Sequence, residues 1–510
     1  MKYTMVVNMG LKSIRCIVFD QNGTKLSSAA EPIKTAINEE RVEQQPQEWW
    51  DKAEKVMRKA YMDSCASRID FITVTASASC LVCVDKQGEA LGNAFMISDK
   101  RAVIEADEIA EMGAYEKTYE DTGLCISASL MLPRILWVKK HMPQQYEKTV
   151  KFLTPNDYMI YKMSGNYITD YFNAMKYHYN PRTERYPSEL LKQMGADVST
   201  LPDVVEPGTI IGELLSQVAE NTTINKDAKI VVTSYDAICS FWGSGVSEDG
   251  EASDVSGTVT VLRTLSKREN VEVDNRIYSL PFKSEKSSIV GGSNNLGGGL
   301  IEWVKQCYYQ KEEYPYEVME KDASESELGA KGLIFLPYLL GERTPIWDDD
   351  ARGVFFGLER MHTRKDMTRA VFESAGFIDM DIISAIEQNG VHVENIRLSG
   401  GLARVNLVSQ IKADILGKDV CVLSEFETTS TGAAMMAFVG GEVYPNLKAT
   451  ADKFARIRMI IKPDMEHHRK YQEVYALYKE TYQTVKPLFI RRKEILKNLA
   501  TNREVQIENL

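Results

Sequence analysis

The pattern of hydrophobic and polar residues predicts three strands at the start of the chain. Residues 3–8 and 14–20 are β-prone runs, and the second ends at residues 20–23, whose sequence is typical of a hairpin turn. Residues 24–30 then supply a third strand. A helix is expected from Pro46, because proline fits the first turn of a helix.

This order of elements occurs twice. The first half continues with predicted strands at 71–75 and 80–85, helices over 131–164 and an apolar strand at 228–233. The second half has strand segments at 252–263, 276–281 and 287–291, helices from about 297 and over 363–388, a strand at 396–399 and a helix over 404–416. Three strands followed by alternating helices and strands, twice over, is the layout of the actin–hexokinase–heat-shock-70 architecture. We therefore predict two α/β domains.

The domain boundary is expected near 243–252, where glycines and polar residues cluster. This gives an N-terminal domain at 1–246, a C-terminal domain at 247–490 and a charged tail at 491–510 that frays. Four tyrosines at helical spacing near the C-terminus predict a packed terminal helix: Tyr471, Tyr475, Tyr478 and Tyr482.

Composition excludes several classes of function. The chain has 510 residues, which is too long for one core, since cores stop growing near ~250–300 residues. A net charge of −11 argues against nucleic acid or an anionic membrane as the partner. The N-terminus is predicted as a strand and not as a signal peptide, and no apolar run approaches the ~20 residues that span a bilayer. A soluble, cytoplasmic protein is expected.

The cysteines predict no metal site. Cys80 and Cys83 form a Cys-x-x-Cys sequence, but no second pair or nearby histidine completes a zinc set. The two side chains would also point to opposite faces of a strand. We expect buried core thiols.

The stretch from Gly332 to Gly357 is the most specific signal in the chain. An apolar strand and an ordinary turn would not account for Glu342-Arg343-Thr344-Pro345 or for the aromatic and acidic residues that follow. The stretch resembles the C-terminal-domain signature of the FGGY family of carbohydrate kinases. Segments at 136–141, 152–158, 165–171, 413–417 and 430–434 follow in the family's order, so that the resemblance covers about 1–485.

The resemblance implies a fold and an activity. It implies two actin/hexokinase-like (ribonuclease H-like) domains around an ATP/sugar cleft, and transfer of the γ-phosphoryl group of ATP to a hydroxyl of a sugar or polyol. The implied cofactors are ATP and Mg²⁺. The expected partner is a small-molecule carbohydrate, with no nucleic acid and no membrane; a homodimer is left open.

Asp236 is the candidate catalytic base, and it is also expected to contact the sugar. It follows an apolar strand and opens a small, apolar helix, so that it should face a cleft. The family places its base here, and phosphoryl transfer needs a carboxylate to receive the hydroxyl proton. The alternative is a helix N-cap with no catalytic role.

Glycine turns are the candidate nucleotide site. Successive backbone N–H groups in such turns can point at phosphate oxygens, and glycine allows close approach. By resemblance, nucleotide contacts are expected from Gly257, Thr258, Gly298, Gly400, Gly401, Ala403 and Asn406. The alternative for the triple glycine at 297–299 is tight packing of a helix on a sheet.

The first phosphate loop departs from the family pattern. The family's Asp-x-Gly-Thr-Thr/Ser-x-x-Arg is replaced by residues 8–15, with Asn8 for the aspartate and Leu11 for a hydroxyl residue. Nucleotide contacts are still expected from Gly10, Lys12, Ser13 and Arg15. Mg²⁺ would be held through water by Asn8 and Asp236, with Lys12 as a candidate source of the missing charge compensation; the alternative for Lys12 is a solvated turn residue.

The candidate sugar residues also depart from the family. A tripeptide that is often Gln-Met-His is here Ser77-Ala78-Ser79, Ala237 replaces a polar residue, and Ile97 replaces an aromatic one. Asp99 and Arg101 remain. The small side chains predict a substrate bulkier than a pentulose, unless other side chains refill the space.

Two other functions stay open. Asn8 and Leu11 favour a non-catalytic sugar- or nucleotide-binding relative, and the architecture alone would also fit a heat-shock-70-like ATPase or another actin-like scaffold. Asp236 and the second-domain glycine turns argue against the former, and the stretch from Gly332 to Gly357 argues against the latter.

Overall fold

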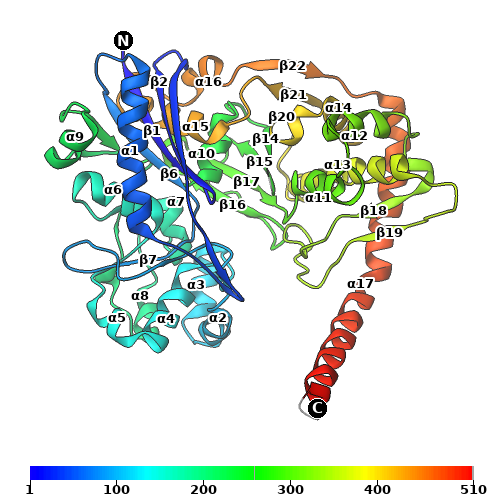
Figure 1. The fold of residues 1–510 in the computed structure, drawn as a ribbon, viewed down its shortest axis with the longest axis horizontal. Helices are drawn as coiled ribbons and strands as arrows, with labels where there is room; N and C mark the ends of the chain where they lie inside the picture. The colour runs from blue at the N-terminus through cyan, green and yellow to red at the C-terminus, as the bar shows by residue number, and fades with distance from the viewer. Residues whose placement is uncertain (258, 508–510) are drawn as a thin grey trace. The chain divides into compact units, whose positions relative to one another are not determined.

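A computed structural model describes residues 1–257 and 259–507, so that Thr258 of the predicted nucleotide site lies outside the described residues. The chain divides into two compact units (Figure 1). Unit 1 contains Met1–Ser247 and Glu427–Arg456, and unit 2 contains Glu248–Phe426 and the chain from Ile457 onward. The sequence-based division differs at 427–456, which was expected in the C-terminal domain.

Helix α15 (Thr428–Gly440) lies in unit 1 because it packs closely against α10 (Asp236–Gly243). A Cβ atom on Gly432 would collide with the carbonyl group of Cys239, and one on Gly243 with that of Thr428. The two helices therefore meet backbone to backbone, which only glycine allows. This contact joins segments that are far apart in the sequence, which local patterns do not show.

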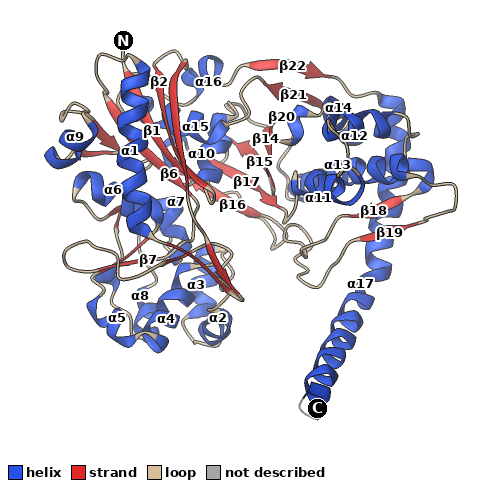
Figure 2. Ribbon diagram, in the orientation of Figure 1, coloured by secondary structure: helices blue, strands red, loops and turns tan. Residues whose placement is uncertain are grey.

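Unit 1 is built on a six-stranded sheet of order β12-β13-β6-β1-β2-β3 (Figure 2). Its strands are β1 (Tyr3–Met9), β2 (Ser13–Asp20), β3 (Lys25–Pro32), β6 (Phe71–Ala76), β12 (Ile210–Glu213) and β13 (Lys229–Val231). Strands β1, β2 and β3 pair antiparallel, β1, β6 and β13 pair parallel, and β12 is an antiparallel edge. This confirms the three predicted initial strands.

Unit 2 repeats this sheet and adds one strand, in the order β16-β17-β15-β14-β20-β21-β22. Its strands are β14 (Glu251–Ser256), β15 (Thr260–Ser266), β16 (Tyr278–Phe282), β17 (Ser287–Ser293), β20 (Asn395–Gly400), β21 (Asp419–Leu423) and β22 (Ile457–Ile461). The directions match strand by strand: β14, β15 and β17 are antiparallel, β14, β20 and β21 are parallel, and β22 is antiparallel. The predicted duplication is confirmed.

Helices and small strands complete unit 1. The helices are α1 (Pro46–Ser64), α2 (Val103–Ala110), α3 (Tyr115–Thr122), α4 (Met131–His141), α5 (Pro143–Lys148), α6 (Pro155–Ser164), α7 (Tyr171–Ala174), α8 (Ser188–Met194), α9 (Ser216–Thr222), α10, α15 and α16 (Lys448–Phe454). The small strands are β4 (Ala36–Asn38), β5 (Arg41–Gln44), β7 (Val82–Val84), β8 (Ala94–Phe95), β9 (Lys151–Leu153), β10 (Ile168–Asp170) and β11 (Asp203–Val205). The helical pattern expected over 131–164 is interrupted at β9, which pairs with β7.

Unit 2 carries α11 (Gly299–Tyr308), α12 (Pro315–Ser324), α13 (Arg364–Gln388), α14 (Asn406–Leu416), α17 (Met465–Ile507) and the strand pair β18 (Ile334–Leu336) and β19 (Val354–Phe356). The four C-terminal tyrosines are buried on α17, which confirms the packed terminal helix. The helix runs on to Ile507, past the start of the segment expected to fray.

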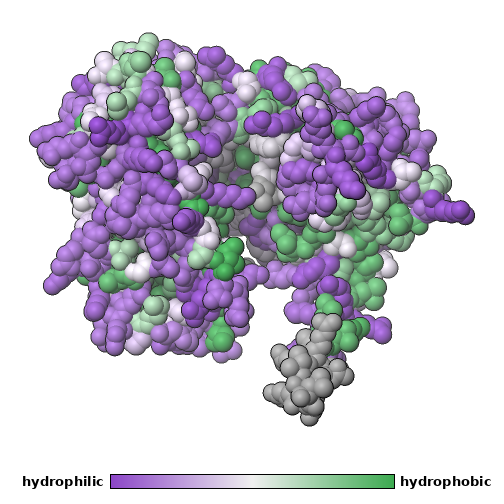
Figure 3. All heavy atoms as spheres, viewed as in Figure 1, coloured by the Kyte–Doolittle hydropathy of each residue, from purple (hydrophilic) through white to green (hydrophobic). Residues whose placement is uncertain are grey.

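Each unit has its own apolar core. In unit 1, alternate residues of β1 such as Met5 and Val7 belong to the same core cluster as Trp49 of α1. In unit 2, α13 supplies much of the core beside β14 and β20. Cys80 and Cys83 are free and buried, as expected. Hydrophilic side chains cover most of the visible face (Figure 3), and no helix in the described chain is long and apolar enough to cross a membrane.

Candidate functional site

The carboxyl ends of two parallel strands bring Ser77 and Asp236 together in unit 1. Ser77 follows β6, and Asp236 begins α10 shortly after β13. The hydroxyl of Ser77 donates a hydrogen bond to Oδ2 of Asp236 at 3.2 Å, although the residues are 159 positions apart. Ligands bind at this edge in open α/β sheets.

Asp236 is placed to meet a ligand. It is partly exposed and is the first residue of α10, and its Oδ1 accepts the N–H of Ala237 at 2.7 Å. The positive end of the helix dipole favours a carboxylate there. The N-cap position of α10 belongs to Tyr235, whose side chain makes no capping bond, and Asp236 follows it as the first helical residue.

The turn before Asp236 is fixed by buried hydrogen bonds. Ser234 donates to Oδ1 of Asp170 at 2.8 Å, and the hydroxyls of Thr233 and Thr73 lie 2.8 Å apart. Asp170 also accepts N–H groups of α7, and burial raises its pKa to about 6. Asp170 belongs to a sequence segment that resembles the family, but sequence analysis assigned no role to it.

Asp99 and Arg101 pair with each other. Nε and NH2 of Arg101 donate to the carboxylate of Asp99 at 2.9 and 2.7 Å, and Asp99 also accepts the N–H of Val42 at 2.8 Å. Burial is the largest single influence on the pKa of Asp99 and raises it. The hydrogen bonds and the charge of Arg101 together outweigh burial, so that the pKa is lowered. Contact of either residue with a sugar remains a prediction.

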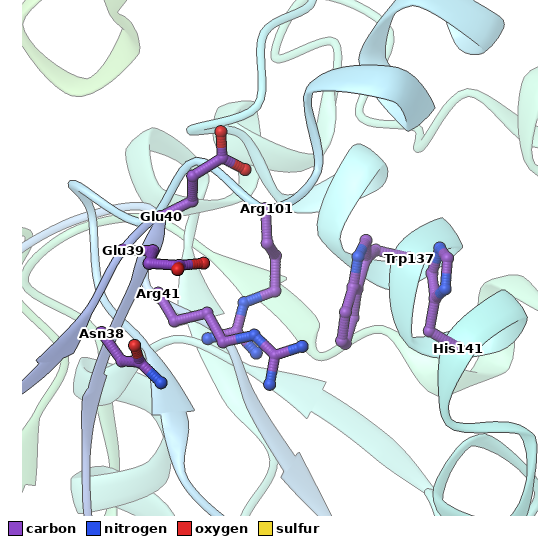
Figure 4. A pocket seen from close by; sticks show the side chains of 7 residues that line it. All are labelled: Asn38, Glu39, Glu40, Arg41, Arg101, Trp137 and His141. Atoms are coloured by element: carbon purple, nitrogen blue, oxygen red, sulfur yellow. The ribbon is translucent and has the colours of Figure 1, made fainter. Parts of the chain in front are cut away.

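A pocket of about 520 Å³ opens beside Arg101 (Figure 4). Its lining residues are Asn38, Glu39, Glu40, Arg41, Arg101, Trp137 and His141. The guanidinium groups of Arg41 and Arg101 lie 5.9 and 5.0 Å from the centre of the Trp137 ring. Ser77 and Asp236 do not line this pocket within the described chain.

The predicted first phosphate loop is an open turn between β1 and β2. The N–H of Gly10 donates to the carbonyl of Ser13 at 3.0 Å, whereas Leu11 and Lys12 are exposed. Arg15 lies on β2 opposite Asn8. The turn therefore leaves its side chains accessible to a ligand.

Asn8 contacts a carboxylate that sequence reasoning missed. Its side-chain nitrogen donates to Oε1 of Glu427 at 3.0 Å and to the hydroxyl of Ser430 at 3.1 Å. Glu427 is the N-cap of α15 and accepts the N–H of Ser430. The negative charge that Asn8 lacks is thus present next to it. No signal near residue 8 could have shown this contact.

Three glycine turns of the candidate nucleotide site meet in unit 2. The N–H of Gly298 donates to the carbonyl of Gly257 at 2.6 Å. A Cβ atom on Gly298 would lie 2.6 Å from that oxygen, and one on Gly400 would lie 2.5 Å from the carbonyl oxygen of Ser256. Gly401 precedes the short helical turn that holds Ala403, and Asn406 begins α14. Gly298 and Gly400 are therefore required by close packing, and nucleotide contact stays a prediction.

A buried ion cluster lies beneath these turns. The ammonium of Lys412 contacts the carboxylates of Asp254 and Asp379, the latter at 2.6 Å, and donates to the hydroxyl of Ser256 at 3.1 Å. All three charged side chains are almost completely buried. Burial and the carboxylate of Asp254 raise the pKa of Asp379 well above its usual range. The cluster holds β14, α13 and α14 together at the start of the Gly257 turn.

The stretch from Gly332 to Gly357 supports another of the turns. Oε1 of Glu342 accepts N–H groups of Asn295 and Arg343 at 2.9 and 2.8 Å, and Thr344 bonds both backbone groups of Ser293. Burial raises the pKa of Glu342 to about 7. The stretch therefore fixes the segment that leads from β17 to Gly298.

Comparisons with known proteins agree with this architecture. Residues 3–243 match the FGGY family of carbohydrate kinases, N-terminal domain, and residues 253–441 match its C-terminal domain. The chain is 27% identical to a xylulose kinase of Bacillus subtilis over 505 residues, 98% of this chain and 100% of that protein. It is 25% identical to a gluconokinase of the same organism over 98% of this chain and 97% of that protein.

Crystal structures of related enzymes share the fold. A ligand-bound xylulose kinase from Lactobacillus acidophilus matches with a TM-score of 0.89 and 23% identity, over 96% of this chain and 100% of that one. A gluconate kinase from the same organism matches with a TM-score of 0.88 and 24% identity, over 95% of this chain and 98% of that one.

Proposed function

The chain belongs to the FGGY family of carbohydrate kinases, and we propose that Asp236 is the general base with which it phosphorylates its sugar or polyol. The hydroxyl oxygen of the acceptor attacks the γ-phosphorus of ATP, ADP leaves, and the hydroxyl proton passes to the Asp236 carboxylate. The observation that carries this role is the position of Asp236, which is partly exposed at the carboxyl edge of the sheet and fixed by Ser77 and the start of α10.

The nucleotide is proposed to use both phosphate loops. The N–H groups around Gly257 and Gly298 would face phosphate oxygens, with Gly400, Gly401, Ala403 and Asn406 beside the nucleoside. Contacts of Gly10, Lys12, Ser13 and Arg15 with the nucleotide are proposed as well. These assignments are supported by the convergence of three glycine turns on one place in unit 2.

Magnesium fits the chain as an ion held mainly by phosphate and water. No group of three or more histidine, cysteine, aspartate or glutamate side chains in the described residues could hold a metal alone. Mg²⁺ keeps several waters and needs only one or two carboxylates. Asp236 and Asn8 would orient such waters, with Glu427 next to Asn8. When bound, the ion would neutralise charge on the transferring phosphoryl group.

The acceptor is proposed to be bulkier than a pentulose. Ser77, Ala78, Ser79 and Ala237 are small, and Ser77 and Ala237 lie on either side of the Asp236 carboxylate in the hydrogen-bond chain. The names of the two Bacillus subtilis relatives point to a ketose and a sugar acid, which are thus the first classes to test.

A coupled ADP assay with ketoses, polyols and sugar acids tests the function. Sugar-dependent ADP formation, most efficient on acceptors of six or more carbons, is the expected result. Highest efficiency on D-xylulose with longer sugars unreactive would contradict the size proposal only. Thermal stabilisation by sugar without turnover would favour the non-catalytic relative, and sugar-independent ATP consumption would indicate a chaperone-like ATPase.

A further inference from the structure

Arg134 is a buried cation that binds only main-chain carbonyl groups. It lies on α4 with 0% exposure, and it forms no ion pair with a carboxylate in the described part of the chain. Burial lowers the pKa of its guanidinium to about 10, so that it is still charged at neutral pH. A buried charge without a counter-ion is costly unless hydrogen bonds replace its hydration.

The hydrogen bonds of Arg134 converge on the two candidate sugar segments. NH1 donates to the carbonyl groups of Ser79 and, at 3.3 Å, Phe95. NH2 donates to the carbonyl groups of Met96, Ile97 and Asp99 at 2.8, 3.2 and 3.3 Å. Nε donates to Ala128 at 3.1 Å, so that all three nitrogens are used.

Ser79 shows why such a clamp is needed. Its φ angle is 59°, in the left-handed region that is unfavourable for a residue with a side chain. Such a conformation persists only where its surroundings enforce it, and this often occurs at ligand sites. Arg134 binds the carbonyl group of Ser79 itself. The strained residue and the residues at 95–99 are therefore held by one guanidinium.

We propose that Arg134 is a positioning residue for the sugar site: it sets the main chain of Ser77–Ser79 and of the segment from Phe95 to Arg101 so that both can meet the acceptor. This inference rests on the proposed function, which assigns the sugar to these segments. Arg134 itself need not touch the sugar. Its planar fork of five N–H donors suits several carbonyls at once, and lysine, with three donors at one point, does not.

The test compares Arg134→Lys with the wild type in steady-state kinetics. The charge is kept and the geometry is lost, so that the sugar KM should rise at least ~10-fold, because small displacements of positioning groups are costly. The ATP KM should stay within about two-fold, because the glycine turns of unit 2 are not contacted by Arg134. A merely structural role would lower activity per milligram and the melting temperature while leaving the sugar KM unchanged, and that result would overturn the proposal.

Lys151→Met is the matched control. Lys151 also donates to main-chain carbonyl groups of unit 1, those of Ser199 and Leu201 at 2.8 and 2.6 Å, but it does not contact the candidate sugar segments. The sugar KM of the Lys151→Met enzyme should stay within about two-fold of the wild-type value. An equal rise in both variants would show that general loosening of unit 1 is responsible, which would also overturn the proposal.

Hydrogen exchange separates this proposal from the proposed function. The N–H groups of Leu81 and Phe95 bond each other's carbonyls at 3.0 Å, and that of Asp99 bonds Met96 at 3.0 Å. Their exchange should accelerate in Arg134→Lys, and peptides from unit 2 should not change. Unchanged exchange would refute the clamp even if no sugar proves to be a substrate, whereas a wild type without sugar-dependent ADP formation would refute the function alone.

A second variant tests the strain at Ser79 directly. Glycine adopts a φ of 59° freely. Adding Ser79→Gly to Arg134→Lys should therefore slow the accelerated hydrogen exchange and lower the raised sugar KM part of the way back to the wild-type values. Should Arg134→Lys fail to fold, a soluble double variant would be compared with the wild type in the same two measurements. A double variant no better protected than a soluble Arg134→Lys would contradict the role assigned to the strained residue.

Discussion

The two units use the same sheet, but they finish its central hairpin differently. In unit 1 the turn between β1 and β2 is open, with Leu11 44% exposed and Lys12 exposed. In unit 2 the corresponding loop begins at Gly257, which is enclosed by the Gly298 and Gly400 turns, above the buried cluster of Lys412. Packing therefore holds the start of the enclosed loop at Gly257, whereas the side chains of Leu11 and Lys12 in the open loop are exposed.

The duplication also places an acid at equivalent points. Asp236 is the first residue of α10, which follows β13, and Glu427 is the N-cap of α15, which follows the corresponding strand β21. Asp236 opens its helix and is partly exposed, whereas Glu427 caps its helix and binds Asn8. An acid at the start of the helix is thus a candidate base in one sequence repeat and a supporting carboxylate in the other, and both acids lie in unit 1.

The largest expected effect is on the enclosed loop. Lys412→Met would leave the buried carboxylates of Asp254 and Asp379 facing each other, and removing one partner of a buried pair costs about 3–5 kcal/mol. Urea unfolding measures this loss. It should grow as pH rises above about 4, because the folded state then retains a proton that the unfolded state releases.

Adding Asp379→Asn to Lys412→Met is the control for this prediction. The amide removes one of the two facing charges, so that part of the lost stability should return. A Lys412→Met protein as stable as the wild type at pH 8 would show that the cluster does not hold the Gly257 turn, and the contrast between the two loops would lose its main support.

The next effect concerns the two equivalent acids. Asp236→Asn should lower kcat by at least ~100-fold, a typical contribution of a positioned base, while sugar binding measured by thermal shift weakens only modestly. Asp227→Asn, at an exposed acid of the same unit that pairs with Arg68, should leave kcat unchanged. An Asp236→Asn enzyme that keeps more than about a tenth of wild-type turnover would remove Asp236 from the base role.

The sequence predicted what local patterns encode. Alternating apolar runs identified the central strands of both sheets, and the motif around Asp236 identified a strand end that opens a helix. The return of 427–456 to unit 1 was not predictable, because it depends on contact between Gly243 and Gly432, glycines from distant segments.

The missed site residues share one cause. Arg134 lies in the apolar run of α4, where an arginine would ordinarily be expected to extend its charge to solvent, yet its partners are carbonyl groups at 79, 95–99 and 128. Glu427 is remote in sequence from Asn8. Every residue has a main-chain carbonyl group, so the sequence does not show which of them bind a given side chain. Only the fold shows that several gather around Arg134.

The smallest effects are expected at the open loop. At ~4 Å and an effective dielectric near 20, a unit charge is worth about 4 kcal/mol before desolvation, so replacing the family's aspartate by Asn8 should be felt by a bound cation. The carboxylate of Glu427 lies 3.0 Å from the side-chain nitrogen of Asn8, so that the cation-binding free energy lost with the family's aspartate should be smaller than this figure. Asn8→Asp should therefore lower the Mg²⁺ requirement only modestly, and should lower the dissociation constant of Mn²⁺ measured by electron paramagnetic resonance with ADP present.

Lys12 completes the comparison. We expect the ammonium group of Lys12 to contact the β- or γ-phosphate, since lysine commonly binds phosphate. Lys12→Ala should then raise the ATP KM by several-fold and make activity more dependent on Mg²⁺. Lys25→Ala, at an exposed lysine on β3, is the matched control and should change neither. Unchanged ATP and Mg²⁺ dependence in Lys12→Ala would leave Glu427 as the remaining source of charge compensation. The open turn would then act through its main chain, as the enclosed turn of unit 2 is proposed to do.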